Sequence, residues 1–208
     1  MKILSLNCRN WNRDTDKQSA FFWKTRMAAM ERMIKDKNPD VICIQEMIAP
    51  AGQYVPDGWK RVGVSVSHHI YVRKGMKAKN HKFGIHCEQA DIDGTRIFCV
   101  HGDWEDKAVD KLCKHLKENA QTFGPTVAIG DFNVGAAALD QHNLPDTARV
   151  RLGMPEEDTF ENFTRPQESH GEIDHAVLWG CTPVAYEIIR YGYGAQRISD
   201  HWPIMVTI

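Results

Sequence analysis

The most informative absences in this sequence concern long apolar runs and net charge. No stretch approaches the ~20 apolar residues that a membrane-spanning helix needs, and the first apolar run gives way at once to polar Asn7, Arg9 and Asn10. The 26 Lys and Arg residues are balanced by 27 Asp and Glu residues, which leaves a formal net charge of −1. We therefore expect a cytoplasmic protein without a membrane span, in which any contact with a polyanion comes from a local patch.

Paired cysteines and proline-rich linkers are also missing. The 208 residues contain nine prolines and show no internal repeat or low-complexity tract, so we expect one domain over residues 1–208. No obligate protein partner is indicated. The cysteines form no C-x-x-C pair, and most of them stand in apolar runs, which favours reduced core thiols. These six cysteines are Cys8, Cys43, Cys87, Cys99, Cys113 and Cys181.

Short apolar runs alternate with amphipathic stretches along the chain. Apolar residues recur at helical spacing in residues 19–37 and 106–122, which predicts two helices. Strands are predicted at residues 2–6, 40–44, 69–72, 95–100, 126–130, 172–179 and 203–208. Residues 135–171 are polar and interrupted by proline, so we expect at most short helices there. This order of elements favours an α/β protein with two packed sheets flanked by helices.

Polar residues stand at the ends of many of these apolar runs. Taken singly, an Asp at such a place is usually a turn former and a His is usually an ordinary core or surface residue. A carboxylate beside a buried strand is nevertheless rare unless it is paired or binds a metal. The recurrence of the pattern therefore indicates a functional site made of Asn7, Glu46, His101, Asp131, Asn133, Asp174, Asp200 and His201.

The same residues lie in a series of short motifs. In chain order these are Leu6-Asn7, Gln45-Glu46, Val100-His101, Gly130-Asp131-Phe132-Asn133, Ile173-Asp174-His175 and Ser199-Asp200-His201. The series resembles the endonuclease/exonuclease/phosphatase superfamily over residues 7–201. The resemblance implies a four-layer α/β sandwich, with two packed mixed sheets flanked by helices and a site at one end of the facing sheets. It also implies phosphoester hydrolysis that depends on a divalent metal.

The residue types suit this chemistry. A phosphoester repels an attacking water, so its hydrolysis needs a cation, fixed donors on the phosphoryl oxygens and a group that deprotonates the water. Mg²⁺ prefers one or two carboxylates and keeps several waters, so Glu46, assisted by Asn7 and Asp200, is the expected metal site, with Mn²⁺ as a possible substitute. In the family that the chain resembles, Glu46 is the principal ligand.

The resemblance also assigns catalytic roles. Asp131 would orient or deprotonate the water, and Asn133, which lies on the same face of an extended segment, would donate to a phosphate oxygen. His201 would contact the phosphate as a cation held in orientation by Asp174. His101 would be a second donor to the transition state. Whether Asp131 or His201 acts as the base stays open at this point.

Three features depart from the family pattern. Gly102-Asp103-Trp104 follows His101 where relatives have a Thr-His-Leu setting, and Glu172 stands where many relatives have Arg, which we expect to add negative charge near the site. The segment between Glu46 and His101 lacks an obvious counterpart of the Tyr that abasic-site endonucleases use. Another interpretation combines Glu172 with His170, Asp174 and His175 as a transition-metal cluster. Strand alternation disfavours that cluster, because it sends neighbouring side chains to opposite faces.

Substrate contacts are expected from Arg9 and Trp11, which follow Asn7 directly, together with His101 and Asn133. A basic stretch at residues 73–82 is either a further contact to a phosphodiester or a solvated hairpin. We expect a nuclease acting on DNA. The alternatives are a phosphatase or phosphodiesterase for a phosphoinositide, nucleotide or other small phosphoester, and a non-catalytic binding module of the same fold.

Overall fold

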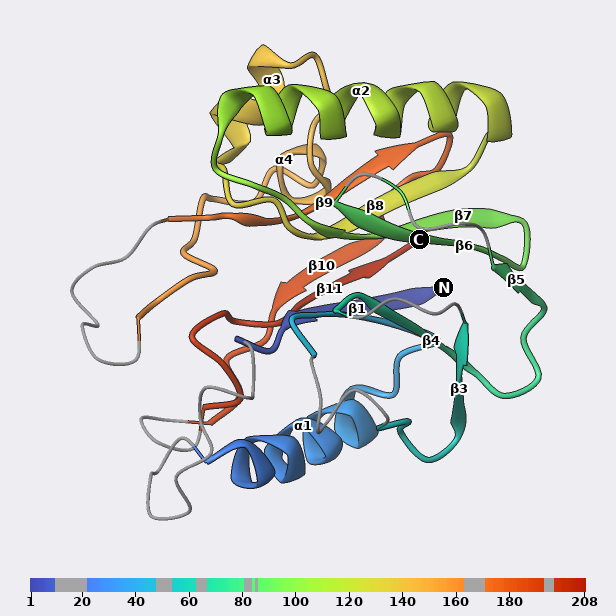
Figure 1. The fold of residues 1–208 in the computed structure, drawn as a ribbon, viewed down its shortest axis with the longest axis vertical. Coiled ribbons are helices and arrows are strands. Elements are labelled where there is room, and N and C mark those ends of the chain that lie inside the picture. The colour runs from blue at the N-terminus through green and yellow to red at the C-terminus, as the bar shows by residue number, and fades with distance from the viewer. Residues whose placement is uncertain are drawn as a thin grey trace.

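The computed structural model describes residues 1–9, 22–47, 54–62, 67–80, 84, 86–162, 171–192 and 197–208. Within these ranges it contains two mixed sheets (Figure 1). The first sheet has the strand order β10-β11-β1-β2-β4-β3 and the second has the order β5-β6-β7-β8-β9. The first comprises β1 (Lys2–Asn7), β2 (Val41–Gln45), β3 (Trp59–Val62), β4 (His69–Arg73), β10 (Ala185–Ile188) and β11 (Ile204–Thr207). The second comprises β5 (Ala78–Asn80), β6 (Cys87–Ile92), β7 (Thr95–His101), β8 (Thr126–Asp131) and β9 (Asp174–Trp179).

Helices cover the outer faces of the two sheets. Figure 1 shows α1 (Trp23–Lys37) against the first sheet and α2 (Asp106–Phe123) against the second. Two short helices, α3 (Ala136–Gln141) and α4 (Ala148–Arg151), lie in the segment expected to hold only short helices. Three apolar clusters fill the spaces between the sheets, under α1 and under α2. These layers confirm the α/β sandwich expected from the sequence.

Both long helices end as their sequences predict. Asn38 adopts a left-handed conformation (φ 50°) and its N–H donates to Ile34 O, and Pro39 then prevents continuation of α1. Gly124 ends α2 with φ 103° and donates to Ala120 O. No described helix is long and apolar enough to cross a membrane.

The directions of the strands bring the strand ends that carry polar residues together. β1 runs parallel to β2, with Asn7 opposite Gln45, and β7 runs parallel to β8, with His101 opposite Asp131. β9 is antiparallel to β8 and therefore begins at the same place, with Asp174 opposite Asp131. We call this end of the sandwich, where β1, β2, β7 and β8 end and β9 begins, the polar edge.

One polar bridge crosses the apolar interface between the sheets. The buried Gln45 amide donates from Nε2 to Ser5 Oγ in its own sheet and to Cys99 Sγ in the other sheet, both at 3.1 Å. Gln45 is the last residue of β2, so the bridge lies next to the polar edge.

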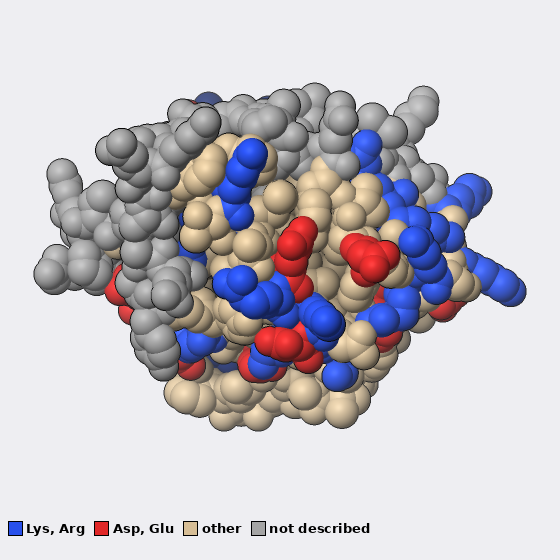
Figure 2. All heavy atoms as spheres, turned by 90° about the horizontal axis from the view of Figure 1, so that it is seen from below, with Lys and Arg blue, Asp and Glu red and all other residues tan. Residues whose placement is uncertain are grey.

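Charged side chains are distributed unevenly on the surface that α1 helps to form. Figure 2 views the molecule from that side and shows acidic and basic side chains intermixed over much of the face. Lys and Arg side chains gather toward the right of the view, where Figure 1 places β3 and β5. These two strands are edge strands of the two sheets and contact each other.

Candidate active site

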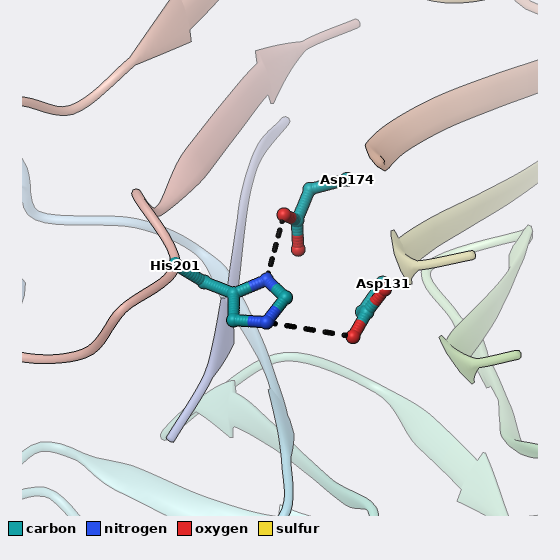
Figure 3. A group of neighbouring side chains, drawn as sticks. All are labelled: Asp131, Asp174 and His201. Carbon is teal, nitrogen blue, oxygen red and sulfur yellow. Dashed lines mark hydrogen bonds and ion pairs between the residues drawn. The ribbon is translucent and has the colours of Figure 1, made fainter. Parts of the chain in front are cut away.

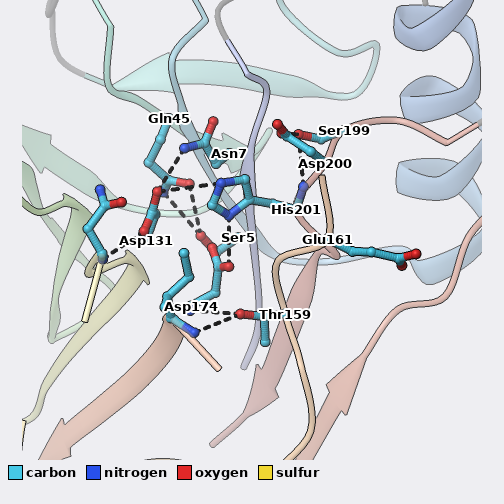
Figure 4. Close-up of polar contacts among 12 residues, drawn as sticks. Ser5, Asn7, Gln45, Asp131, Thr159, Glu161, Asp174, Ser199, Asp200 and His201 are labelled. Carbon is cyan, nitrogen blue, oxygen red and sulfur yellow. Dashed lines mark hydrogen bonds and ion pairs between the residues drawn. The ribbon is translucent and has the colours of Figure 1, made fainter. Parts of the chain in front are cut away.

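Asp131 is the centre of the polar edge. Its carboxylate is buried, with 1% of the residue exposed. Asp131 Oδ2 accepts a hydrogen bond from Asn7 Nδ2 at 2.9 Å and lies 3.7 Å from His201 Nε2 and 3.8 Å from His101 Nε2 (Figure 4). Its other oxygen accepts from the backbone N–H of Asn133 at 2.8 Å. The structure thus brings four predicted site residues together around the carboxylate of a fifth, Asp131.

His201 and Asp174 form a buried pair beside this carboxylate. His201 Nδ1 lies 2.9 Å from Asp174 Oδ2, and the opposite ring nitrogen faces Asp131 (Figure 3). Thr159 Oγ1 accepts hydrogen bonds from the backbone N–H groups of Ile173 and Asp174, which fixes the start of β9. This arrangement orients the imidazole from one side and leaves its Nε2 directed at Asp131.

The charged groups in this cluster shift one another's pKa values. Burial alone would lower the pKa of His201, but the carboxylates of Asp174 and Asp131 outweigh it and raise the pKa to about 10. Burial raises the pKa of Asp131, and Asp174 adds to that rise, while His201, His101 and the Asn7 hydrogen bond oppose it. At neutral pH the imidazole is therefore a cation between two carboxyl groups.

Glu46 and His101 form the more open side of the site. Asn7 Nδ2 donates to Glu46 Oε1 at 3.1 Å, and His101 Nε2 lies 3.4 Å from the same oxygen. About a quarter of each of the Glu46 and His101 side chains is exposed. Glu46 has φ 57°, a left-handed conformation that costs a non-glycine residue about 1–2 kcal/mol and turns its side chain away from the path of β2.

Asp200 lies at the rim of the cluster. Its carboxylate is 3.3 Å from Arg9 Nε and accepts a hydrogen bond from Ser199 Oγ at 3.1 Å. Arg9 also binds the site through its backbone, because its N–H donates to Asn7 Oδ1 at 2.7 Å. Arg9 therefore connects the exit of β1 to the loop that carries His201. Trp11, the other expected substrate contact, lies outside the described residues.

Two groups of side chains can be compared as metal ligands. Asp131, Asp174 and His201 are a described group whose ligand atoms all lie within 4.8 Å of one another. This group is fully buried, and its imidazole is engaged by Asp174 and cationic, so it suits a hydrated Mg²⁺ poorly. The Glu46 carboxylate is partly exposed and shares the Asn7 amide with Asp131, and a partly exposed carboxylate suits an ion that keeps several of its waters. The residues present therefore fit a hydrated divalent cation at Glu46.

Gly102 explains why the residues after His101 depart from the family pattern. A Cβ at Gly102 would collide with the backbone carbonyl of Phe132. This close approach lets the Gly102 N–H donate to Asp131 O at 2.7 Å and lets Gly102 O accept from Asn133 Nδ2 at 3.0 Å. The glycine thus joins the loop after β7 to the turn after β8, where Asn133 adopts φ 58°.

The negative charge expected from Glu172 is neutralised. Glu172 Oε2 accepts from Arg149 Nε at 2.5 Å, and both residues are buried. Burial raises the pKa of Glu172 to about 7, against the effect of Arg149, and the short contact with the guanidinium favours the ionised pair. The expectation that Glu172 adds charge to the site is corrected accordingly.

The alternative transition-metal cluster is not assembled by its described members. His175 Nε2 lies 2.9 Å from Val134 O, and its Nδ1 lies 3.8 Å from Glu172, whereas Asp174 points to His201. Burial lowers the pKa of His175 to about 4, so its imidazole is neutral. His170 lies outside the described residues. Strand alternation therefore separates Asp174 from His175, as the sequence indicated.

Two residues near the site were missed by the sequence analysis. Arg26 interrupts the apolar stripe of α1 but is 1% exposed, and its guanidinium donates from Nη1 to Cys8 O and Ile198 O. It thereby holds the segments that leave β1 and approach Asp200. His68 precedes β4, with its ring centroid 5.8 Å from that of His101. Burial, and then His101, lower the pKa of His68 to about 3. The only signal in the sequence for Arg26 was its position within the apolar stripe of the predicted helix at residues 19–37.

The basic stretch does not line the polar edge. β4 begins with His69 opposite Ile44 and ends with Arg73, whose N–H donates to Asp40 O at the start of β2. Lys74 and Lys77 follow in the turn at that opposite end. His81 and Lys82 lie outside the described residues.

Known proteins resemble this chain in sequence pattern and in fold. The family model described as "Endonuclease/Exonuclease/phosphatase family" matches residues 20–201. TDP2 of D. rerio, solved with a single-strand DNA product, has a TM-score of 0.75 at 16% identity, covering 99% of this chain and 97% of that one. NExo of Neisseria, a 3' phosphatase solved with a product DNA hairpin, has a TM-score of 0.75 at 16% identity, covering 100% and 99%.

A third similar structure is mannosyl-6-phosphatase of Bacteroides thetaiotaomicron, with a TM-score of 0.74 at 18% identity, covering 100% of this chain and 98% of that one. At these identities the structural matches show a shared fold. A comparison with curated protein sequences found no match.

Proposed function

This chain belongs to the endonuclease/exonuclease/phosphatase family, and we propose that it is a divalent-metal-dependent hydrolase of DNA phosphodiester bonds. The observation that carries the proposal is the convergence of Asn7, His101 and His201 on the buried carboxylate of Asp131, with Glu46 beside them. We further propose that residues 1–208 form one catalytic domain.

Asp131 is proposed as the group that orients and deprotonates the attacking water. We assign the base to Asp131 in preference to His201, because Nδ1 of His201 is bound to Asp174 and the raised pKa of His201, about 10, supports a cationic imidazole at neutral pH. Asp131 remains, and burial raises its pKa, which makes the carboxylate a better proton acceptor. The cationic His201 would instead stabilise negative charge on the phosphoryl oxygens.

Glu46 would hold Mg²⁺, or Mn²⁺ in its place, with Asn7 and Asp200 as the accompanying residues. The bound ion would polarise the phosphoryl oxygen and neutralise developing charge. Asn7 donates its amide hydrogens to Glu46 and Asp131 and thereby keeps the two carboxylates at a fixed separation. His101 and Asn133 would donate to the phosphate from the two loops that Gly102 joins. Arg9 and Trp11 would contact the substrate at the rim.

The preference for DNA is supported by two similar structures. TDP2 of D. rerio and NExo of Neisseria were both solved with DNA products, and both cover nearly the whole chain. The similarity to mannosyl-6-phosphatase favours the second candidate, a phosphatase for a small phosphoester that uses the same residues. Both candidates require the same site, so the substrate has to be measured.

The test is Mg²⁺-dependent turnover by the purified protein on supercoiled plasmid and an abasic duplex, beside a panel of phosphoinositides and nucleotides. Asp131→Asn and Glu46→Gln should each lower turnover by about 10²–10⁴-fold, whereas the matched control Asp140→Asn, an exposed aspartate on α3, should not change it.

DNA cleavage that disappears with chelator and in Asp131→Asn supports the proposed nuclease. Phosphate release from small esters without DNA cleavage would replace it with the phosphatase. Absence of turnover on every substrate would favour a non-catalytic binding module and overturn the proposal.

A further inference from the structure

The strongest feature outside the site is the group of exposed cations on β3, β5 and the turn before β5. It comprises Lys60, Arg61, Lys74, Lys77 and Lys79, which we call the basic edge. β3 and β5 are edge strands of the two sheets and contact each other, so the group lies on one side of the sandwich (Figure 2). Lys77 and Lys79 also line a surface hollow.

Nearby carboxylates do not cancel this charge. Asp91 is engaged by Arg96 through two contacts of 2.8 and 3.2 Å. Asp93 accepts the backbone N–H of Lys77 at 3.0 Å and lines the same hollow as Lys77 and Lys79, so its negative charge offsets one of the five cations. Lys60 Nζ donates to Met76 O at 3.1 Å, a bond to a neutral carbonyl that retains the positive charge. The basic edge therefore carries a local excess of positive charge on a chain with a net charge of −1.

The basic edge lies within reach of the polar edge. Lys79 is opposite Asp91, which is opposite Arg96, and Arg96 is separated from His101 by about 16 Å along β7. The sideways step from β5 to β7 adds about 10 Å. Lys79 lies beside the start of β7 and the polar edge lies at the end of that strand, so a nucleic-acid strand that contacts both must turn from one face of the sandwich onto another. Duplex DNA has a persistence length of about 50 nm and cannot follow such a turn, whereas a flexible single strand can.

We propose that the basic edge is an accessory site for the backbone of single-stranded DNA that leaves the catalytic site on the β3–β5 side. This inference rests on the proposed function. The contact is electrostatic and independent of sequence, since lysines offer point charges to phosphates. The competing explanation is that lysines on edge strands only prevent sheet-to-sheet aggregation.

The experiment measures binding of a fluorescent single-stranded oligonucleotide by anisotropy, in chelator so that no turnover occurs. The edge variant combines Lys74→Glu, Lys77→Glu and Lys79→Glu. The matched control combines Lys107→Glu, Lys111→Glu and Lys114→Glu on the exposed face of α2, which changes the net charge by the same amount.

The edge variant should raise the Kd at least about 10-fold and reduce the slope of log K against log salt by about 2, near 0.7 per lost phosphate contact. The α2 control should change both much less. A blunt duplex should lose less affinity than the single strand. Equal weakening by the two triple variants, or equal loss for duplex and single strand, would overturn the proposal.

Turnover of bis(p-nitrophenyl) phosphate with Mg²⁺ separates this inference from the proposed function. Both triple variants should hydrolyse this small ester as the unmodified protein does, because it cannot reach the basic edge. Absence of hydrolysis by the unmodified protein would count against the proposed function, whereas the binding comparison in chelator tests the basic edge by itself.

Discussion

Replacing Asp174 by Asn tests the electrostatic reasoning about the site most directly. The amide keeps the size of the side chain and the backbone contact to Thr159, but it removes the negative charge 2.9 Å from His201 Nδ1. A neighbouring carboxylate shifts a pKa by about 1–3 units, which corresponds to about 1.4–4 kcal/mol. The pKa of His201, about 10 beside Asp174 and Asp131, should therefore fall to roughly 7–9 in the variant.

NMR titration of the imidazole nitrogens in metal-free protein measures this change. At pH 9 His201 should be mainly protonated in the unmodified protein and more neutral in Asp174→Asn. If the His201 cation stabilises the transition state, the alkaline limb of the turnover profile should move to lower pH by the same amount. Asp140→Asn should move neither midpoint. A His201 titration that is the same with and without Asp174 would refute the electrostatic account.

Three further results are expected. Arg149→Leu should lower the free energy of unfolding by about 3–5 kcal/mol in urea, because it leaves Glu172 buried without its partner, and adding Glu172→Leu should restore much of the loss. The pKa of His175 is about 4 in the folded protein and about 6.5 for an unperturbed histidine, so the contribution of its neutral imidazole to stability is present above pH 6.5 and is lost as the pH falls toward 4. Urea unfolding should show that the free energy of unfolding falls by up to about 3 kcal/mol over this pH range, and His175→Gln should not show this fall. Gly102→Ala should cost about 1–3 kcal/mol in thermal unfolding and lower turnover more than 10-fold, because its Cβ meets Phe132 O; unchanged turnover would contradict the role given to this loop.

The strands that end in site residues could be predicted from the sequence because their apolar runs stop abruptly. Buried β1, β2 and β8 contain continuous apolar residues, and each is followed by or ends in a polar residue. Parallel pairing then places the ends of β1 and β2 together in one sheet and the ends of β7 and β8 together in the other. The strand expected at residues 172–179 begins two residues later, because β9 starts at Asp174.

Strands at the sides of the sheets were harder to predict. β6 has the sequence CEQADI, and its polar residues conceal the strand although Glu88 and Gln89 are buried. β3, β5 and β10 have four residues or fewer, which is too short for a periodic signal. Pairing with neighbouring strands, rather than local preference, fixes these segments.

Long-range contacts of charged side chains could not be predicted from the sequence either. Glu172 looked like an added negative charge because its partner Arg149 lies on a different element, α4. Arg26 was not singled out from the sequence, because its guanidinium donates to two loop carbonyls that are far apart in the chain. Such partners are set by tertiary packing, and hydrophobic periodicity carries no information about them.

The Gln45 bridge makes the alignment of the two sheets part of the geometry of the proposed catalytic site. Asn7 and Glu46 belong to one sheet, whereas Asp131 belongs to the other, and the apolar packing between the sheets is not directional. The bond from Gln45 to Cys99 is directional and lies next to the site. A misplacement of about 1 Å can cost about 10²-fold in rate. The two sheets must therefore be aligned with each other much more accurately than folding alone requires.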